Sequence, residues 1–211
     1  MRKIGFTFAV ILGIAILVRY GFAQSADTQS QPSSSNQLQF PKTASNLLAE
    51  IADIDKLRIL NPLDLTADQL QQLTTIIISA QVKYNQQLIK LTVEPLEKIA
   101  SQIHQTKQQA LTGAPIPKEF DQQIKDMQSK FEKERTDLDN QTLASLADQI
   151  HSVVTDKQFK MMADQARKVE TNSKGTDQQY FNLFVREVFI RYPRIVTLLE
   201  QMHTAKLGAG Q

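Results

Sequence analysis

Apolar residues recur every three or four positions from about residue 43 onward, which is the spacing of one face of an α-helix. The spacing predicts helices over about 44–59, 67–111, 118–153, 156–170 and 177–206. The segment Gly113-Ala114-Pro115-Ile116-Pro117 is the strongest turn signal, and Pro95 and Pro193 should kink or restart the helices that contain them. Because no segment has a strand pattern of note, the predicted fold class is all-α: an elongated bundle of long kinked helices with an additional aromatic-rich C-terminal helix.

The predicted helices differ in how much apolar surface they carry. The first has a single stripe made of Leu47, Leu48, Ile51, Ile54 and Leu57. The second has a bundle seam made of Leu70, Leu73, Ile77, Ala80, Tyr84, Leu88 and Leu91, which Ile76, Ile78, Val82 and Ile89 widen. We therefore expect the second helix to contact more than one neighbour. The middle of the third, residues 130–141, is highly charged and should be exposed on most sides.

The N-terminal region has the features of a secretory signal. Arg2 and Lys3 precede an apolar run from Ile4 to Val18, and Gly21-Phe22-Ala23 offers a cleavage site. The run of about 15 residues is short for a membrane span, which needs roughly 20, although an uncleaved N-terminal anchor remains the alternative. We therefore predict a signal peptide at 1–23 and a periplasmic or secreted protein without stable membrane insertion after cleavage. A disordered Ser/Gln-rich linker at 24–42, a helical domain at 43–206 and a disordered tail at 207–211 complete the predicted organisation.

Composition narrows the function classes. The chain has 24 Lys and Arg against 22 Asp and Glu, but three of the basic residues and none of the acidic ones lie in the predicted leader. Without the leader the balance is 21 against 22, a formal charge of −1. The bulk charge therefore argues neither for nucleic acid nor for anionic lipid, and no nucleic-acid partner is expected. The absence of Cys excludes disulfides and thiol chemistry, so the fold must rest on burial.

Two segments share one helix-start pattern: Leu65-Thr66-Ala67-Asp68-Gln69-Leu70 and Val154-Thr155-Asp156-Lys157-Gln158-Phe159. In each, the Thr hydroxyl can accept from the backbone N–H three residues later, and the Gln can reach back to the backbone N–H of the Thr. The apolar residues that flank each Thr-x-x-Gln form a hydrophobic staple. We interpret these residues as structural caps. A third box, Thr176 to Gln179, follows Gly175 and so has no staple.

The pair of Leu-Thr-x-x-Gln-type motifs in a small exported helical protein resembles the Spy/CpxP family of periplasmic proteins, over about residues 46–170. The resemblance implies a thin, curved helical bundle in which each motif starts a helix. It also implies ATP-independent chaperoning, envelope stress response or metal tolerance, with dimerisation into a cradle that holds unfolded clients in some members.

The sequence contains no pattern typical of catalysis or of metal binding. No His, Asp or Glu lies three or four positions after His104, His151 or His203, and we interpret all three as solvated or partly packed side chains. Met127, Met161, Met162 and Met202 are interpreted as core residues, not as a Cu(I) site. We found no phosphate-binding loop, nucleophile motif or paired catalytic carboxylates. The chain is therefore expected to be a non-enzyme without catalytic residues, metal or cofactor.

The most prominent apolar feature is an aromatic set, which consists of Tyr180, Phe181, Phe184, Phe189 and Tyr192. Two interpretations stay open: these side chains close the core, or they form a client or dimer surface. The leading functional hypothesis is an extracytoplasmic chaperone-like or envelope-stress protein that binds apolar segments of unfolded or partly folded proteins, with a homodimer as one assembly. The alternatives are a structural or regulatory module that docks one dedicated envelope protein and, with less support, a metal-responsive periplasmic protein.

Overall fold

The computed structural model describes residues 42–170 and 174–209, and every regular element in these residues is helical. The predicted all-α fold class is confirmed. The signal peptide predicted at 1–23 and the linker predicted at 24–42, except for Lys42, lie outside the described residues. The chain separates into two units, Met1–Ala52 and Asp53–Gln211. The boundary falls within helix α2, Lys42–Leu60.

The apolar stripe predicted on the first helix is mostly exposed. In the first unit, Leu47, Leu48 and Ile51 are each more than half exposed. In the second unit, Leu57 is half-buried and Leu60 is fully buried. The C-terminal end of α2 therefore belongs to the core of the second unit.

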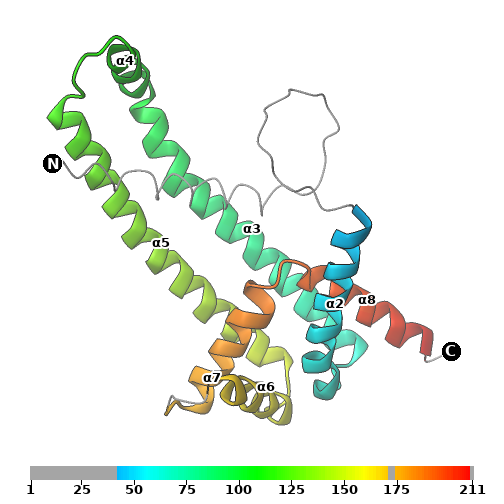
Figure 1. Ribbon diagram of the computed structural model, residues 1–211. Helices are drawn as coiled ribbons and strands as arrows, with labels where there is room; N and C mark the ends of the chain where they lie inside the picture. The colour runs from blue at the N-terminus through cyan, green and yellow to red at the C-terminus, as the bar shows by residue number, and fades with distance from the viewer. Residues whose placement is uncertain (1–41, 171–173, 210–211) are drawn as a thin grey trace. The chain divides into compact units, whose positions relative to one another are not determined.

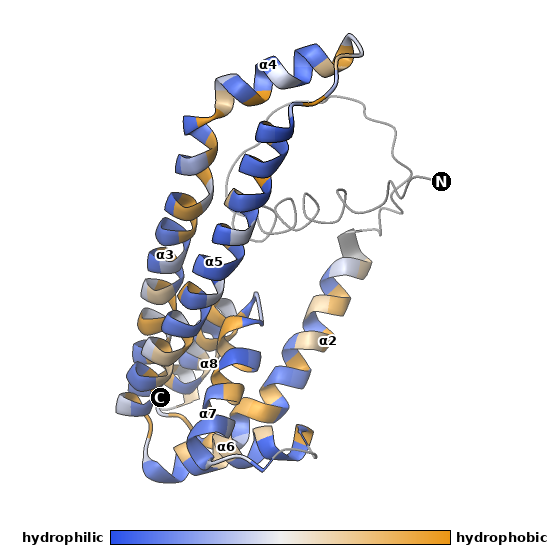
Figure 2. Cartoon of the chain, turned by 90° about the vertical axis from the view of Figure 1, so that its left-hand side faces the viewer, coloured by the Kyte–Doolittle hydropathy of each residue, from blue (hydrophilic) through white to orange (hydrophobic). Residues whose placement is uncertain are grey.

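The second unit is dominated by a long helical hairpin. Its arms are α3, Ala67–Lys98, and α5, Lys118–Val153, which pack against each other. The short helix α4, Ala100–Leu111, lies across the far end of the two arms (Figure 2). Gly113, with a φ of 86°, follows α4 and reverses the chain, as the turn signal predicts. Both the end of α4 and the extent of α5 agree with the apolar spacing.

The break between α3 and α4 does not lie at Pro95, where a kink or restart of the helix was predicted. Pro95 lies inside α3, and the helix ends three residues later, at Lys98. Ile99 has φ −115° and ψ 10°, outside the helical region, and its N–H donates to the Leu96 carbonyl at 3.2 Å. Pro95 has no N–H and so removes one backbone hydrogen bond from α3, but the helix continues past it. The chain changes direction about one turn later, at Ile99.

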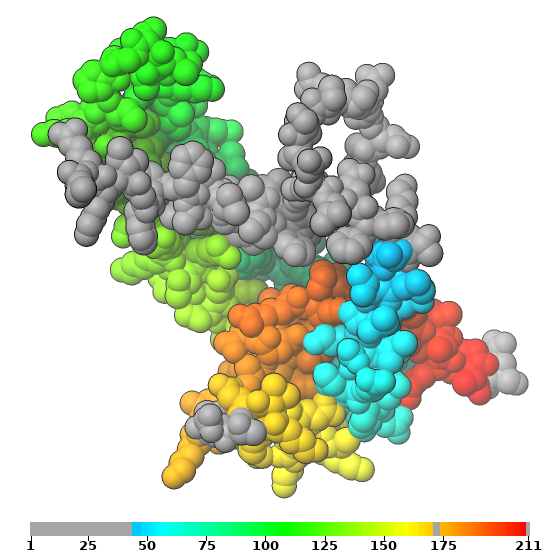
Figure 3. All heavy atoms as spheres, in the orientation of Figure 1, coloured from blue at the N-terminus to red at the C-terminus, as the bar shows by residue number. Residues whose placement is uncertain are grey.

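The other end of the hairpin carries the shorter helices (Figure 1). These are the 3₁₀-helix η1, Asn61–Leu63; α6, Asp156–Val169; α7, Asp177–Phe184; the π-helix η2, Val185–Ile190; and α8, Ile195–Ala209. Helix α6 packs against α7, and α8 packs against α3. Figure 3 shows the adjoining surfaces of α6 in yellow and α7 in orange. Because α3 contacts both α5 and α8, the prediction that it has more than one neighbour is confirmed.

The C-terminal region differs from the sequence prediction at two places. The helix predicted over 177–206 is interrupted around Pro193, as expected, but it also contains the unpredicted π-helix η2. Helix α8 continues to Ala209, so residues 207–209 of the tail predicted at 207–211 are helical, and residues 210–211 lie outside the described residues. No helix in the described ranges combines the length and the apolar character that crossing a membrane requires.

The core of the second unit lies at the end of the hairpin where the shorter helices gather. Its largest fully buried side chains are Leu60, Leu63, Leu65, Leu70, Leu73, Ile77, Ile150, Met162, Phe181, Phe189, Ile195 and Leu199. In the parts of the arms farther from this core, residues 78–98 of α3 and 118–137 of α5, the apolar residues are only half-buried or exposed. The far part of the hairpin is therefore two helices with little core between them.

Candidate functional site

The two matched helix starts form the predicted caps. Thr66 and Thr155 have extended backbones, with ψ of 165° and 159°. The N–H of Gln69 donates to Thr66 Oγ1 at 3.1 Å, and the N–H of Thr66 donates to Gln69 Oε1 at 3.0 Å. The same pair of bonds joins Thr155 and Gln158, at 3.3 and 2.8 Å. Both capping boxes are confirmed, and each opens a separate helix.

Three of the four staple residues are buried, and the fourth is half-buried. Leu65 and Leu70 are at most 1% exposed, and Val154 is buried. Phe159 is half-buried, with its ring stacked on His151 at a centroid distance of 4.5 Å and tilted against Phe181 at 4.7 Å. The caps are therefore set into the core end of the hairpin.

The two motifs bind each other directly, which sequence reasoning missed. Gln69 Nε2 donates to Gln158 Oε1 at 2.9 Å, and Gln158 Nε2 donates to Gln69 Oε1 at 3.0 Å. Each amide also donates to a carbonyl just before the other motif: Gln69 to Val153 at 2.9 Å and Gln158 to Leu63 at 3.1 Å. All four hydrogen-bonding positions of each amide are occupied. The arrangement ties the start of α3 to the start of α6.

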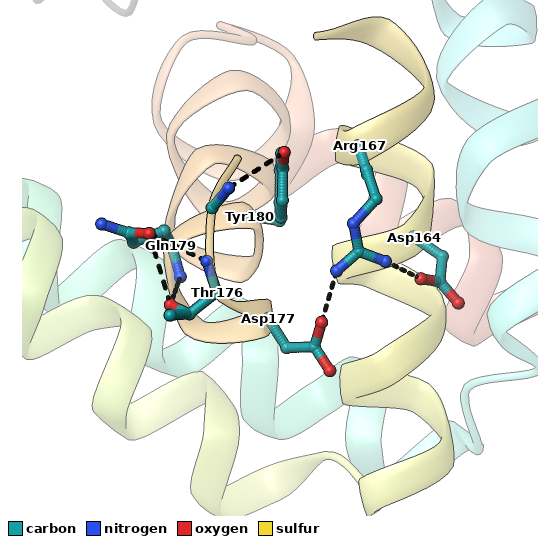
Figure 4. A network of polar contacts seen from close by, with 7 residues as sticks. Asp164, Arg167, Thr176, Asp177, Gln179 and Tyr180 are labelled. Atoms are coloured by element: carbon teal, nitrogen blue, oxygen red, sulfur yellow. Dashed lines mark hydrogen bonds and ion pairs between the residues drawn. The ribbon is translucent and has the colours of Figure 1, made fainter. Parts of the chain in front are cut away.

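The third capping box makes a different tertiary contact. Thr176 and Gln179 exchange the expected cap bonds at 3.3 and 2.9 Å (Figure 4). Here the contact to α6 comes from Arg167, which bonds both Asp164 and Asp177. The Arg167 guanidinium also lies 4.6 Å from the ring centroid of Tyr180, at cation–π distance. The network joins the end of α6 to the start of α7.

The aromatic set is part of the core, so its interpretation as a client or dimer surface is wrong. Tyr180, Phe181, Phe184, Phe189 and Tyr192 are each no more than 8% exposed. With Val185 and Val188 they form three adjacent pairs, Tyr180-Phe181, Phe184-Val185 and Val188-Phe189, that repeat every four residues, and Tyr192 continues the repeat as a single residue. In a regular α-helix of 3.6 residues per turn, this repeat would rotate by about 40° at each step. The π-helix holds more residues per turn, as the Arg191-to-Arg186 bond across five residues shows, and so keeps the pairs facing the core.

A buried acidic group at Asp53 was also missed. Asp53 is 8% exposed and accepts hydrogen bonds from the Tyr192 hydroxyl and from Arg194, whose Nη2 lies 2.8 Å from Oδ2. The Arg194 hydrogen bond lowers the pKa of Asp53 against the opposing effect of burial. Burial, with the bond to Asp53, raises the pKa of Tyr192 to about 12. The available signal was the helical register, which places Asp53 on the same face as Leu57 and Leu60.

Part of the exposed apolar surface of the second unit is a stripe along α3. The stripe consists of Ile78, Val82, Ile89, Val93 and Leu96, which are between 37% and 53% exposed. At 100° per residue these positions share one face, well separated from the buried seam of Leu70, Leu73 and Ile77. In Figure 2 the facing arm, α5, is mostly hydrophilic along its far part. We call these five residues the α3 stripe.

No catalytic or metal-binding residue is predicted from the sequence. Within residues 42–170 and 174–209, no group of three or more His, Cys, Asp and Glu side chains could hold a metal ion. The candidate features are thus the paired glutamines, which are structural, and the α3 stripe, which is accessible. Comparison with protein-family models, curated proteins and solved structures finds no match for this chain.

Proposed function

We propose that this protein is an extracytoplasmic, ATP-independent chaperone-like or envelope-stress protein that binds apolar segments of client proteins. The supporting observation is the α3 stripe, five large apolar side chains along one face of a helix in a part of the hairpin with little core. Several large exposed apolar side chains on one helix face are typical of interaction sites. The resemblance of the two helix starts to the Spy/CpxP family and the signal-like N-terminal region also support the proposal.

The proposed mechanism is shielding. A client segment that would otherwise self-associate covers the α3 stripe and thereby removes its own apolar surface from water. The interaction uses neither a nucleotide nor a metal. Because the stripe presents only aliphatic side chains, we expect weak selectivity among client sequences.

Light scattering from an aggregating client tests the proposal, with the protein added from substoichiometric to equimolar ratio. We expect suppression that rises with the ratio and is reduced at least severalfold by the double variant Val82→Asp and Ile89→Asp. Leu207→Asp is the matched control, because Leu207 is 54% exposed on α8 and Ile89 is 53% exposed on α3. No suppression at any ratio would defeat the proposal. A pull-down that yields one partner, without suppression, would favour the dedicated docking module.

A further inference from the structure

A groove at the core end of the second unit has no role in the arrangement described so far. Its volume is about 980 Å³, and its walls are the end of α2 with η1, the last turns of α6, and the junction of α7 with η2. This volume is in the range of small-molecule sites. Gln165 on α6 donates to the Ile59 carbonyl at 3.0 Å and so ties two of the walls together.

The floor of the groove is mostly apolar. Ile59, Met161 and Leu183 contribute one half-buried side chain from each wall. Such a floor favours a ligand portion without hydrogen-bonding groups, because polar groups placed there would lose water without gaining partners. An alkyl chain meets this requirement better than a peptide backbone does.

The charged residues of the lining favour an anion. Lys56 and Lys168 line the groove, and neither forms an ion pair with any residue that the structure describes. Lys56 Nζ also lies 5.4 Å from the centroid of the Tyr192 ring, at cation–π distance, a contact that leaves its charge unneutralised. Two of the three lining carboxylates are already engaged: Asp164 by Arg167, and Glu187 by Arg186 and Arg191. Only Glu170 opposes the two lysines. Positive charge is therefore available beside the apolar floor.

From these observations we infer that the groove binds a single-chain amphipathic anion, a long-chain carboxylate of the fatty-acid type. The alkyl chain lies on Ile59, Met161 and Leu183, and the carboxylate is held by Lys168 and Lys56. The site is separate from the α3 stripe, so the inference does not rest on the proposed chaperone function.

Calorimetric titration of the full chain with dodecanoate, below its micelle concentration, tests the inference. We expect saturable binding that butyrate does not reproduce and that dodecyltrimethylammonium reproduces at least fivefold more weakly. Leu183→Asp should weaken dodecanoate binding at least tenfold. Lys168→Glu should weaken it at least threefold and remove the preference for the anionic head.

Matched controls separate the groove from the α3 stripe and from exposed lysines elsewhere in the second unit. Ile89→Asp changes an exposed apolar residue on α3, and Lys133→Glu changes an exposed lysine on α5. Both should bind dodecanoate like the unmodified chain, and circular dichroism should show equal helicity for all variants. Unchanged binding by a folded Leu183→Asp variant, equal weakening by Ile89→Asp, or displacement of dodecanoate by an uncharged apolar peptide at comparable concentration would overturn the inference.

Discussion

The side-chain amides of Gln69 and Gln158 form two hydrogen bonds with each other, at 2.9 and 3.0 Å, although 89 residues separate them in the chain. Each amide caps its own helix and, through the same atoms, holds the other cap. Local helix initiation and tertiary assembly are therefore coupled at one point. The third box lacks such an amide partner in the described residues and relies on Arg167 for its contact to α6.

The coupling predicts non-additive losses of stability. Gln158→Ala should lower the free energy of unfolding by about 2 kcal/mol, because the buried Leu63 carbonyl loses its donor and the Gln69 amide loses two of its four hydrogen bonds. Adding Gln69→Ala should cost less than the sum of the two single changes, with an interaction energy of about 1 kcal/mol. Urea unfolding followed by circular dichroism measures all three variants.

Gln179→Ala is the control for this prediction, because Gln179 caps α7 without an amide partner from another motif. We expect it to cost about 1 kcal/mol, the value of a cap alone. Strict additivity of the Gln69 and Gln158 changes, or an equal loss from Gln179→Ala, would contradict a tertiary role for the pair.

The Asp53 cluster predicts a stability loss at acid pH. Because the folded pKa of Asp53 is below the ordinary 3.8, the ionised group stabilises the fold above that value, and the stabilisation disappears as the pH falls through the lower folded pKa. Asp53→Asn should therefore cost about 1–3 kcal/mol at neutral pH, with a smaller difference from the unmodified chain near pH 3. Urea midpoints at both pH values measure this.

Asp55→Asn provides the comparison for Asp53→Asn, because Asp55 forms only an exposed pair with Arg58. It should change stability by no more than about 0.5 kcal/mol at neutral pH. A loss from Asp53→Asn that is equally small, or that does not change with pH, would argue against the buried cluster.

Two tyrosines should ionise only at unusually high pH. Burial raises the pKa of Tyr84 and of Tyr192 to about 12, and hydrogen bonds to Asp139 and Asp53 respectively add to the effect. The stability that neutral Tyr192 contributes is complete below pH 10 and is lost as the pH rises towards 12. Since the chain has four tyrosines and no tryptophan, tyrosinate absorbance reports the titration directly. Tyr192→Phe should remove one late-titrating group, and a curve unchanged around pH 12 would contradict this assignment.

Two glycines should respond in opposite directions to alanine. A Cβ at Gly175 would lie 3.1 Å from the Tyr180 ring, which is itself held between the start of α7 and Arg167. Gly175→Ala should therefore cost about 1 kcal/mol. Gly208 lies in α8 with no atom within 4 Å of its added Cβ, so Gly208→Ala should stabilise by about 0.5 kcal/mol. Thermal unfolding distinguishes them, and a shift of the same sign for both would contradict the prediction.

Helix starts were predictable because their determinants lie within four or five residues. The hydroxyls of Thr66 and Thr155 accept hydrogen bonds from backbone N–H groups in the first turn of the helix that each residue starts. Gly113 marks the chain reversal before α5. The π-helix η2 was not predicted, although the four-residue spacing of the aromatic pairs was a signal for it. The position of Ile99 as the break after Pro95 had no comparable local signal.

The amino-acid sequence alone therefore determined the all-α class, the capped starts of α3, α6 and α7, and the extent of α5. Tertiary structure decided which apolar stripes are covered: the aromatic set is buried, and the α3 stripe is exposed. It also decided that Gln69 meets Gln158 and that Asp53 meets Arg194. The physical reason is range, since capping and periodicity act within a few residues, whereas burial and side-chain pairing depend on which distant helices the fold places side by side.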